Sequence, residues 1–165
     1  MLLSFVIASI LIELTPGPNM TWLAVLGASR GRTTALAAVA GICLGLAIAA
    51  AVAGFGLTAV LLEFPTLFQL LRWGGTFYLF YLAWDAWRDG DGTESLSHTN
   101  ATRGIAFRQG LISNILNPKA YLFYAAMLPQ FISGSMGLAA EVTLLSAIYV
   151  AVATAIHSGI ALLAG

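Results

Sequence analysis

The stretch Glu13-Leu14-Thr15-Pro16-Gly17-Pro18-Asn19 interrupts an apolar run that covers about residues 1–28. Proline has no amide hydrogen and clashes with the preceding helical turn, so two prolines around a glycine should open a helix here. At ~1.5 Å per residue, Gly17 lies ~18 Å from the end of the run, near the middle of a bilayer. Backbone groups freed at that depth need partners in protein or in a water-filled cavity. The stretch therefore predicts a membrane helix that is broken at mid-depth.

The composition favours the membrane class before any other motif is considered. Apolar residues make up 59% of the 165 residues and charged residues only 8%, against about 25% charged residues in ordinary soluble domains. The formal net charge is zero, with seven basic and seven acidic residues. Because the chain has no basic patch or tail, nucleic acid is not expected as a partner.

The hydropathy pattern predicts an all-α, polytopic membrane protein that forms a single domain over residues 1–165. A span needs roughly 20 apolar residues to cross a hydrocarbon core of ~30 Å. Five segments meet this length, at about 1–28, 35–62, 66–87, 109–133 and 141–164. The polar stretch 88–108 is rich in Asp, Gly, Ser and Thr and is predicted to be a loop.

The charges between the spans predict an orientation. The connections 29–34 and 88–108 contain or border five arginines, whereas the second and fourth connections have no Lys or Arg: Arg30, Arg32, Arg88, Arg103 and Arg108. Cytoplasmic loops carry the excess of Lys and Arg. We therefore expect 29–34 and 88–108 to face the cytoplasm and the N-terminus to lie outside.

A second break is predicted in the fourth span at Asn114-Ile115-Leu116-Asn117-Pro118-Lys119. Pro118 is ~15 Å deep from the same side as the first break, and the first and fourth spans run in opposite directions. Inverted repeats with interrupted helices at corresponding positions indicate a transporter binding site. The predicted substrate-binding residues are those around the two breaks: Pro16, Gly17, Pro18, Asn19, Asn114, Asn117, Pro118 and Lys119.

Two charged residues lie deep inside predicted spans. A charge at the bilayer centre costs at least ~2.5–3.5 kcal/mol, so Lys119 should face a cavity or a partner. Lys119 is a candidate for substrate or proton handling, and Glu13 is a candidate carrier of a coupling proton. The alternatives are a structural ion pair between these two residues or, for Lys119, snorkelling. His157 in the fifth span is interpreted as a hydrogen-bonded packing residue, with a proton relay as the alternative.

Other patterns are read as structural. The spacing of Gly41 and Gly45 in the second span lets helices approach closely and predicts a packing surface. Aromatic rings at the inner end of the third span, among them Trp84 and Trp87, are typical interface anchors. No metal-ligand spacing, phosphate loop or nucleophile elbow occurs in the sequence. We therefore expect no metal, no cofactor and no enzymatic activity.

Taken together, these motifs resemble the LysE/RhtB family of amino-acid exporters over nearly the whole chain. The resemblance rests on three groups of residues: Leu14-Thr15-Pro16-Gly17-Pro18-Asn19-Met20; Leu71-Arg72-Trp73-Gly74-Gly75-Thr76-Phe77-Tyr78-Leu79 with Tyr81-Leu82 and Trp87-Arg88; and Phe107-Arg108-Gln109-Gly110 followed by Asn114, Asn117-Pro118-Lys119-Ala120 and Leu128-Pro129-Gln130-Phe131.

The resemblance implies a secondary transporter that exports a small amino acid or a close derivative from the cytoplasm. It also implies that the proton motive force drives export and that the chain lies in the lipid bilayer of a bacterial inner membrane. Members of the family usually have a sixth span, and the predicted spans here number five. The alternative function is therefore a truncated, non-transporting paralogue that pairs with a full-length exporter. A homo-oligomer is a further possible assembly.

Overall fold

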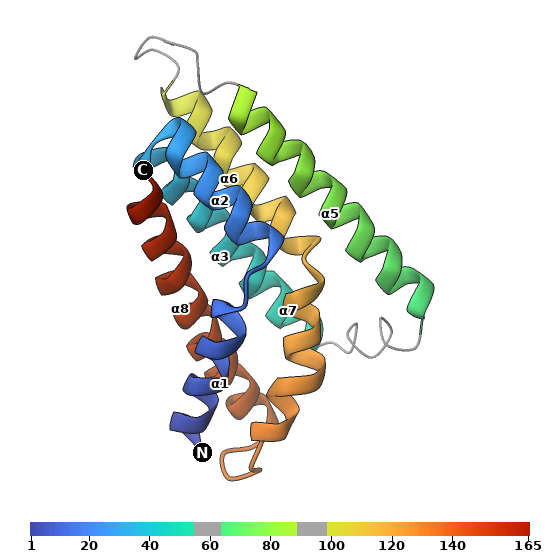
Figure 1. Ribbon diagram of the computed structural model, residues 1–165. Helices are drawn as coiled ribbons and strands as arrows, with labels where there is room; N and C mark the ends of the chain where they lie inside the picture. Colours follow the sequence, from blue (N-terminus) through green and yellow to red (C-terminus); the bar gives the residue numbers. More distant parts are fainter. Residues whose placement is uncertain (55–63, 89–98) are drawn as a thin grey trace.

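The computed structural model describes residues 1–54, 64–88 and 99–165, and over these residues the chain is helical (Figure 1). The elements are α1 (Leu2–Leu14), α2 (Pro18–Arg30), α3 (Arg32–Gly54), α5 (Pro65–Arg88), α6 (Thr99–Ile115), α7 (Pro118–Leu122), the π-helical turn η3 (Phe123–Met127), the 3-10 turn η4 (Leu128–Phe131) and α8 (Leu138–Ala164). The all-α prediction is confirmed for the described part of the chain.

Two helices in the described residues are long and apolar enough to cross a membrane, and a bent helix pair makes a third stretch if it is taken as one span. They are Arg32–Ala53 within α3, the whole of α8, and the pair α1 and α2 taken together, which bends by 63° at the break. The predicted second span, 35–62, and Glu63 beside it run into residues that the structure does not describe. The bounds of α5 coincide with the predicted third span, 66–87, but α5 is not among the described helices apolar enough to count as a candidate span. The count of five spans remains a prediction.

The predicted loop 88–108 is wrong in its second half, because α6 already begins at Thr99. Polar composition suggested a loop, but α6 is amphipathic. Ala106 and Gly110 are buried against the bundle, while Arg103 and Arg108 are exposed. The polar residues of this segment therefore form the exposed face of a helix, and they do not indicate a loop. Residues 89–98 of the predicted loop lie outside the described residues.

Small residues bring α3 and α6 into close contact, and the prediction of a packing surface at Gly41 and Gly45 is confirmed. A Cβ at Gly41 would collide with the backbone carbonyl of Phe107, and one at Gly45 would lie 3.0 Å from the Cβ of Asn114. α3 also packs along α8, so it holds α6 and α8 on either side of itself. Close backbone approach of this kind is how membrane helices pack in the absence of a hydrophobic driving force.

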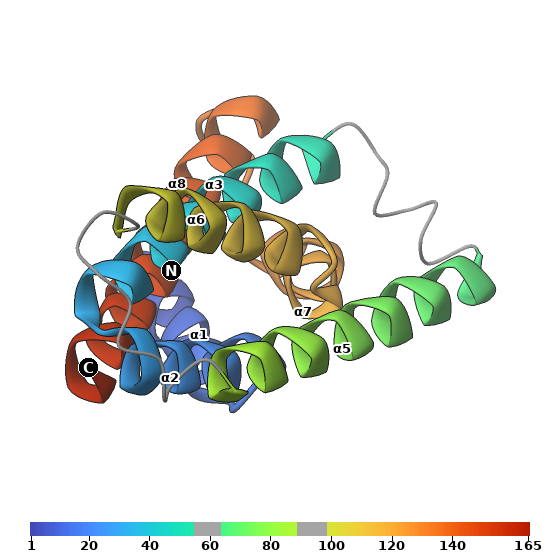
Figure 2. The same ribbon diagram turned by 90° about the horizontal axis from the view of Figure 1, so that it is seen from above.

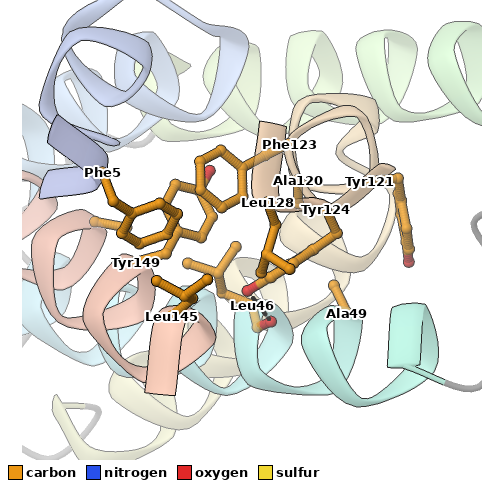
Figure 3. Close-up of a cluster of buried hydrophobic side chains, with 11 residues drawn as sticks. Phe5, Leu46, Ala49, Ala120, Tyr121, Phe123, Tyr124, Leu128, Leu145 and Tyr149 are labelled. Carbon is orange, nitrogen blue, oxygen red and sulfur yellow. Dashed lines mark hydrogen bonds between the residues drawn. The ribbon is translucent and has the colours of Figure 1, made fainter. Parts of the chain in front are cut away.

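Two clusters of buried side chains lie on either side of the first break. In one cluster, the rings of Phe123 and Tyr149 stack with centroids 3.5 Å apart, and Phe5 packs against Phe123 (Figure 3). The other cluster is built around Trp22 and Leu26 of α2, where α3, α5, α6 and α8 meet it. α5 packs mainly along α2 at the edge of the bundle (Figure 2). α1 and α2 therefore pack into different clusters. The chain changes direction in the linker between them.

Candidate functional site

The first break follows from the two prolines. α1 ends at Leu14, Thr15 is extended, and Gly17 is the extended N-cap residue of α2 with φ −129° and ψ 164°. The backbone N–H of Thr15 still donates to the carbonyls of Leu11 and Ile12, at 3.2 and 3.1 Å. Beyond that point Pro16 and the first residue of α2 have no N–H to donate, so the last carbonyls of α1 need other partners. The predicted break is confirmed.

The second break is formed by Asn117 and Pro118. Pro118 is the first residue of α7, where a missing N–H has no cost. Asn117 caps this helix, because its side-chain Oδ1 accepts from the backbone N–H of Lys119 at 3.1 Å. On the other side of the break, the hydroxyl of Tyr121 donates to the carbonyl of Ile115 at 2.8 Å. The fourth predicted span is therefore interrupted where the sequence indicated.

The two breaks face each other across the bundle. The side-chain Nδ2 of Asn19 donates to Oδ1 of Asn114 at 3.2 Å, and the two residues are only 3% and 2% exposed. The other halves of the two amides, Oδ1 of Asn19 and Nδ2 of Asn114, have no partner among the described residues. Exchanging O and N in both amides would again leave one acceptor and one donor unpaired. Such buried unpaired groups are costly and suggest a ligand or an ordered water.

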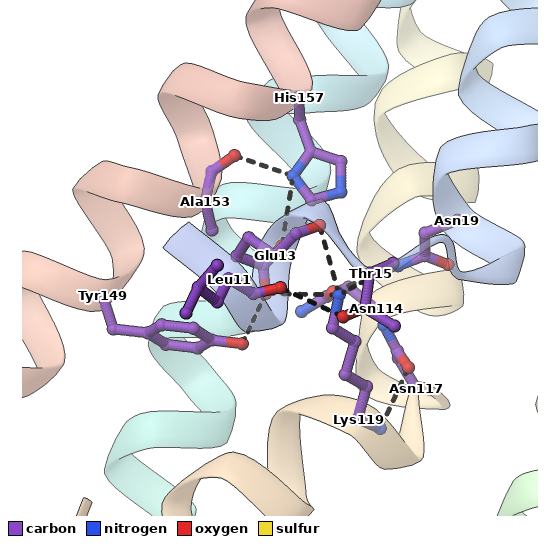
Figure 4. Close-up of polar contacts among 10 residues, drawn as sticks. All are labelled: Leu11, Glu13, Thr15, Asn19, Asn114, Asn117, Lys119, Tyr149, Ala153 and His157. Carbon is purple, nitrogen blue, oxygen red and sulfur yellow. Dashed lines mark hydrogen bonds and ion pairs between the residues drawn. The ribbon is translucent and has the colours of Figure 1, made fainter. Parts of the chain in front are cut away.

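Glu13 is the centre of a second group of polar side chains beside the amide pair (Figure 4). It is 4% exposed, and its Oε1 accepts a hydrogen bond from the hydroxyl of Tyr149 at 2.6 Å. Its Oε2 lies 3.9 Å from Nδ1 of His157. That Nδ1 is 2.7 Å from the carbonyl oxygen of Ala153, which can only accept, so Nδ1 carries a hydrogen. Glu13 therefore contacts two titratable side chains of α8.

Lys119 joins the two breaks directly. Its Nζ donates to the carbonyl oxygens of Thr15 and Glu13, at 3.2 and 3.4 Å, and lies 3.8 Å from Oε1 of Glu13. The predicted ion pair with Glu13 is thus present. The ammonium also caps the C-terminal end of α1, where the helix dipole favours a positive charge.

These groups surround a small cavity. It is lined by polar side chains from both breaks and from α8, together with a few apolar ones: Glu13, Gly17, Asn19, Met20, Leu46, Asn114, Asn117, Lys119, Ala120, Tyr149 and His157. The cavity has a volume of about 10 Å³, which is roughly room for one water molecule. A larger cavity of about 340 Å³ lies between α2 and α5 and shares Gly17 with the small one. The site is closed in this conformation.

Most of the predicted site residues meet here. Five of the eight line the small cavity, and Pro16 lines the larger one instead. Pro118 forms the break but does not line the cavity, and the side chain of Pro18 lies outside the described part of the structure. Sequence reasoning missed Tyr149 and favoured a packing role for His157. In the structure both residues lie on the buried face of α8, where buried positions recur every fourth residue.

The family model of LysE type translocators matches residues 10–165. The chain belongs to this family. The resemblance found in the sequence is confirmed, and the chain is a membrane translocator and not an enzyme.

Several curated relatives are similar to this translocator. Homoserine/homoserine lactone efflux proteins of Salmonella typhimurium and Salmonella typhi are each 29% identical to it, over 98% of this chain and 79% of theirs. A Vibrio cholerae protein described as an uncharacterized membrane protein is 29% identical over 79% of this chain and 64% of its own. No solved structure matches the translocator.

Proposed function

We propose that this translocator exports a small amino acid or a close derivative from the cytoplasm through the site between the two breaks. The observation that carries the proposal is the meeting of Glu13, Lys119 and the Asn19–Asn114 amide pair at two interrupted helices. Discontinuous helices of this kind offer carbonyls to cations and amides to anions, and they occur at transporter binding sites. The proposal includes the inverted-repeat arrangement, five spans, and cytoplasmic placement of 29–34 and 88–108 in a bacterial inner membrane.

The names of the relatives indicate which substrate chemistry fits. Homoserine has an ammonium group and a carboxylate, whereas its lactone keeps the amine but has no carboxylate. The shared groups are therefore the amine and a carbonyl oxygen. The site offers matching partners, since Glu13 and the free Oδ1 of Asn19 accept hydrogen bonds and the free Nδ2 of Asn114 donates one. We infer a substrate that is recognised by its primary amine and by one carbonyl oxygen.

Binding requires the site to open, because about 10 Å³ holds one water and no amino acid. The neighbouring cavity between α2 and α5, at about 340 Å³, is within the usual range of ligand sites, about 300–1,000 Å³. Gly17 lines both spaces, and a Cβ at Gly17 would meet nothing within 4 Å. A movement of the linker between α1 and α2 would therefore join the two cavities, and this movement is our proposed opening step.

Proton coupling is assigned to Glu13. A carboxylate buried in the membrane must be paired or neutralised, and here its partners are Lys119, Tyr149 and His157. A proton on Glu13 would replace the positive charge of Lys119 as the neutralising partner. The proton motive force can then act on the same carboxylate that contacts the substrate amine.

Export from intact cells tests the proposal. Cells that produce the protein are loaded with homoserine, and internal homoserine is followed over time with and without an ionophore that collapses the proton gradient. We expect faster loss of homoserine than in cells with an empty vector, and we expect the ionophore to abolish the difference. Glu13→Gln and Pro16→Ala should remove export, whereas Pro129→Ala, a proline outside the site, should retain it.

Two results would contradict the proposal. Equal accumulation in both strains, with the protein present in the membrane and across a panel of amino acids, would exclude export. Export that survives the ionophore would exclude proton coupling. Reconstitution of the purified chain in liposomes distinguishes the alternative function, because a paralogue that needs a full-length exporter would not transport alone.

A further inference from the structure

The end of α1 presents three oxygen atoms to one cation. The carbonyl oxygens of Glu13 and Thr15 and the Oε1 atom of Glu13 converge on the Nζ of Lys119, at 3.4, 3.2 and 3.8 Å. An ammonium group has three hydrogens to donate and no acceptor. The arrangement therefore matches a primary ammonium group, whichever molecule carries it.

The break creates this set of acceptors. In a continuous helix the carbonyls of Glu13 and Thr15 would accept from backbone N–H groups four residues later. The extended linker at Gly17 removes that pattern, and both carbonyls accept from Nζ of Lys119. Two carbonyls beside a buried carboxylate are then available to a cation.

Lys119 is suited to occupy these acceptors reversibly. Its backbone is fixed by the Asn117 cap, so only the flexible four-carbon side chain has to move for the ammonium to leave. Its side chain is 25% exposed, whereas that of Glu13 is 5% exposed. The lysine thus approaches the acceptors from the more open side of the site, and the oxygens remain in place when it withdraws.

We propose that the three oxygens form the subsite for the substrate's ammonium group, and that Lys119 occupies this subsite until the substrate displaces it. This inference rests on the proposed function, whose substrates share a primary amine. It assigns Lys119 the role of an internal competitor. The opposite assignment, in which Lys119 binds the substrate's carboxylate, does not explain why its ammonium already lies on three acceptors.

Lys119 is the only lysine in the sequence, so its exposure can be measured without changing the protein. The purified wild-type chain in lipid nanodiscs is treated with an amine-acetylating reagent, and acetylation of Lys119 is followed by mass spectrometry. With the reagent in large excess over the amine of the added ligand, we expect slow labelling that accelerates several-fold with homoserine or its lactone and stays unchanged with N-acetylhomoserine, which has no ammonium. The Lys119→Met variant has no lysine and gives the background. Protection of Lys119 by homoserine would overturn the proposal, as would equal acceleration by N-acetylhomoserine.

A binding measurement gives an independent result. If Lys119 holds the subsite at least about 90% of the time, its removal lowers the apparent Kd about tenfold or more. Lys119→Met should therefore bind homoserine and its lactone more tightly than wild type, in calorimetry on the same nanodiscs. Weaker or unchanged homoserine binding by a folded Lys119→Met variant would overturn the proposal that the substrate displaces Lys119.

The two proposals fail separately. If the protein exports homoserine in cells but homoserine protects Lys119 from acetylation, the proposed function stands and the ammonium subsite is refuted. If the protein exports nothing but primary amines accelerate the labelling of Lys119, the proposed function is refuted and the ammonium subsite stands.

Discussion

The contact between α3 and α6 can be tested with two glycines of the same helix. Gly110 and Gly104 both lie inside α6, but their surroundings differ. A Cβ at Gly110 would lie 3.0 and 3.1 Å from the backbone C and Cα of Ala38 and would collide with the carbonyl oxygen of Ala38. A Cβ at Gly104 would meet nothing within 4 Å. The perturbation is therefore one methyl group added at each position in turn.

The expected magnitudes follow from these distances. Alanine is favoured over glycine in a helix interior by about 0.8–1.0 kcal/mol, and both variants share this gain. Only Gly110→Ala brings carbon atoms closer than the optimum of about 3.5–4.0 Å, and the opposing atoms belong to a backbone that cannot rotate away. Overpacking costs typically about 1–3 kcal/mol. We expect Gly104→Ala to be more stable than Gly110→Ala by about 1–3 kcal/mol.

The assay is reversible unfolding of the purified variants in mixed detergent micelles, followed by the fluorescence of the tryptophans. Gly104→Ala should unfold at the same or higher denaturant concentration than wild type, and Gly110→Ala at a lower one. Equal unfolding midpoints for the two variants would refute the close contact of α3 and α6. Because Gly45 on the same face of α3 packs against Asn114, loss of this contact would also displace the amide pair of the site.

The remaining predictions concern the site and the entry to α8. Tyr149→Phe removes the 2.6 Å hydrogen bond to Glu13 and should slow homoserine export by about 10- to 150-fold, since a hydrogen bond to a charged group contributes about 1.5–3 kcal/mol. The exposed Tyr81→Phe is the matched control, and equal export rates for the two variants would contradict the role of Tyr149. Asn114→Leu should abolish export at unchanged protein level, measured in the same cells, and export at the wild-type rate would remove the amide pair from the site. Glu141 accepts five hydrogen bonds from the loop before α8. Glu141→Gln should lower the melting temperature and expose that loop to protease while homoserine binding stays unchanged; an unchanged melting curve would contradict the loop's dependence on Glu141.

The breaks could be predicted from sequence because they depend on covalent structure. A proline removes a hydrogen-bond donor wherever it lies in a helix, so Pro16 and Pro118 disrupted their helices irrespective of tertiary context. The start of α6 at Thr99 could not be placed in the same way. Its first two turns are polar, and polarity alone does not distinguish an exposed helical face from a loop.

The site was predicted on the broken helices and missed on the intact one. Asn19 and Lys119 could be predicted because they adjoin prolines, and Asn114 because it lies one helical turn before Pro118. Tyr149 has neither property, and an aromatic residue in a hydrophobic helix is usually packed or at an interface. Its role depends on the distance to Glu13, 136 residues earlier in the chain. Only the tertiary fold establishes that contact, although Tyr149 and His157 lie eight residues apart and therefore share one face of α8.

The charges at the break set a condition on the transport cycle. Breaking a buried ion pair by removing one partner costs about 3–5 kcal/mol, so Glu13 needs one positive partner in every state of the proposed cycle. Lys119 supplies it in the closed state, as its 3.8 Å distance from the carboxylate shows. The substrate's ammonium would supply it when the site is loaded, and a proton would supply it when neither is present. Because these three partners exclude one another at a single carboxylate, substrate and proton would bind alternately, which is the requirement for coupling outward export to inward proton movement.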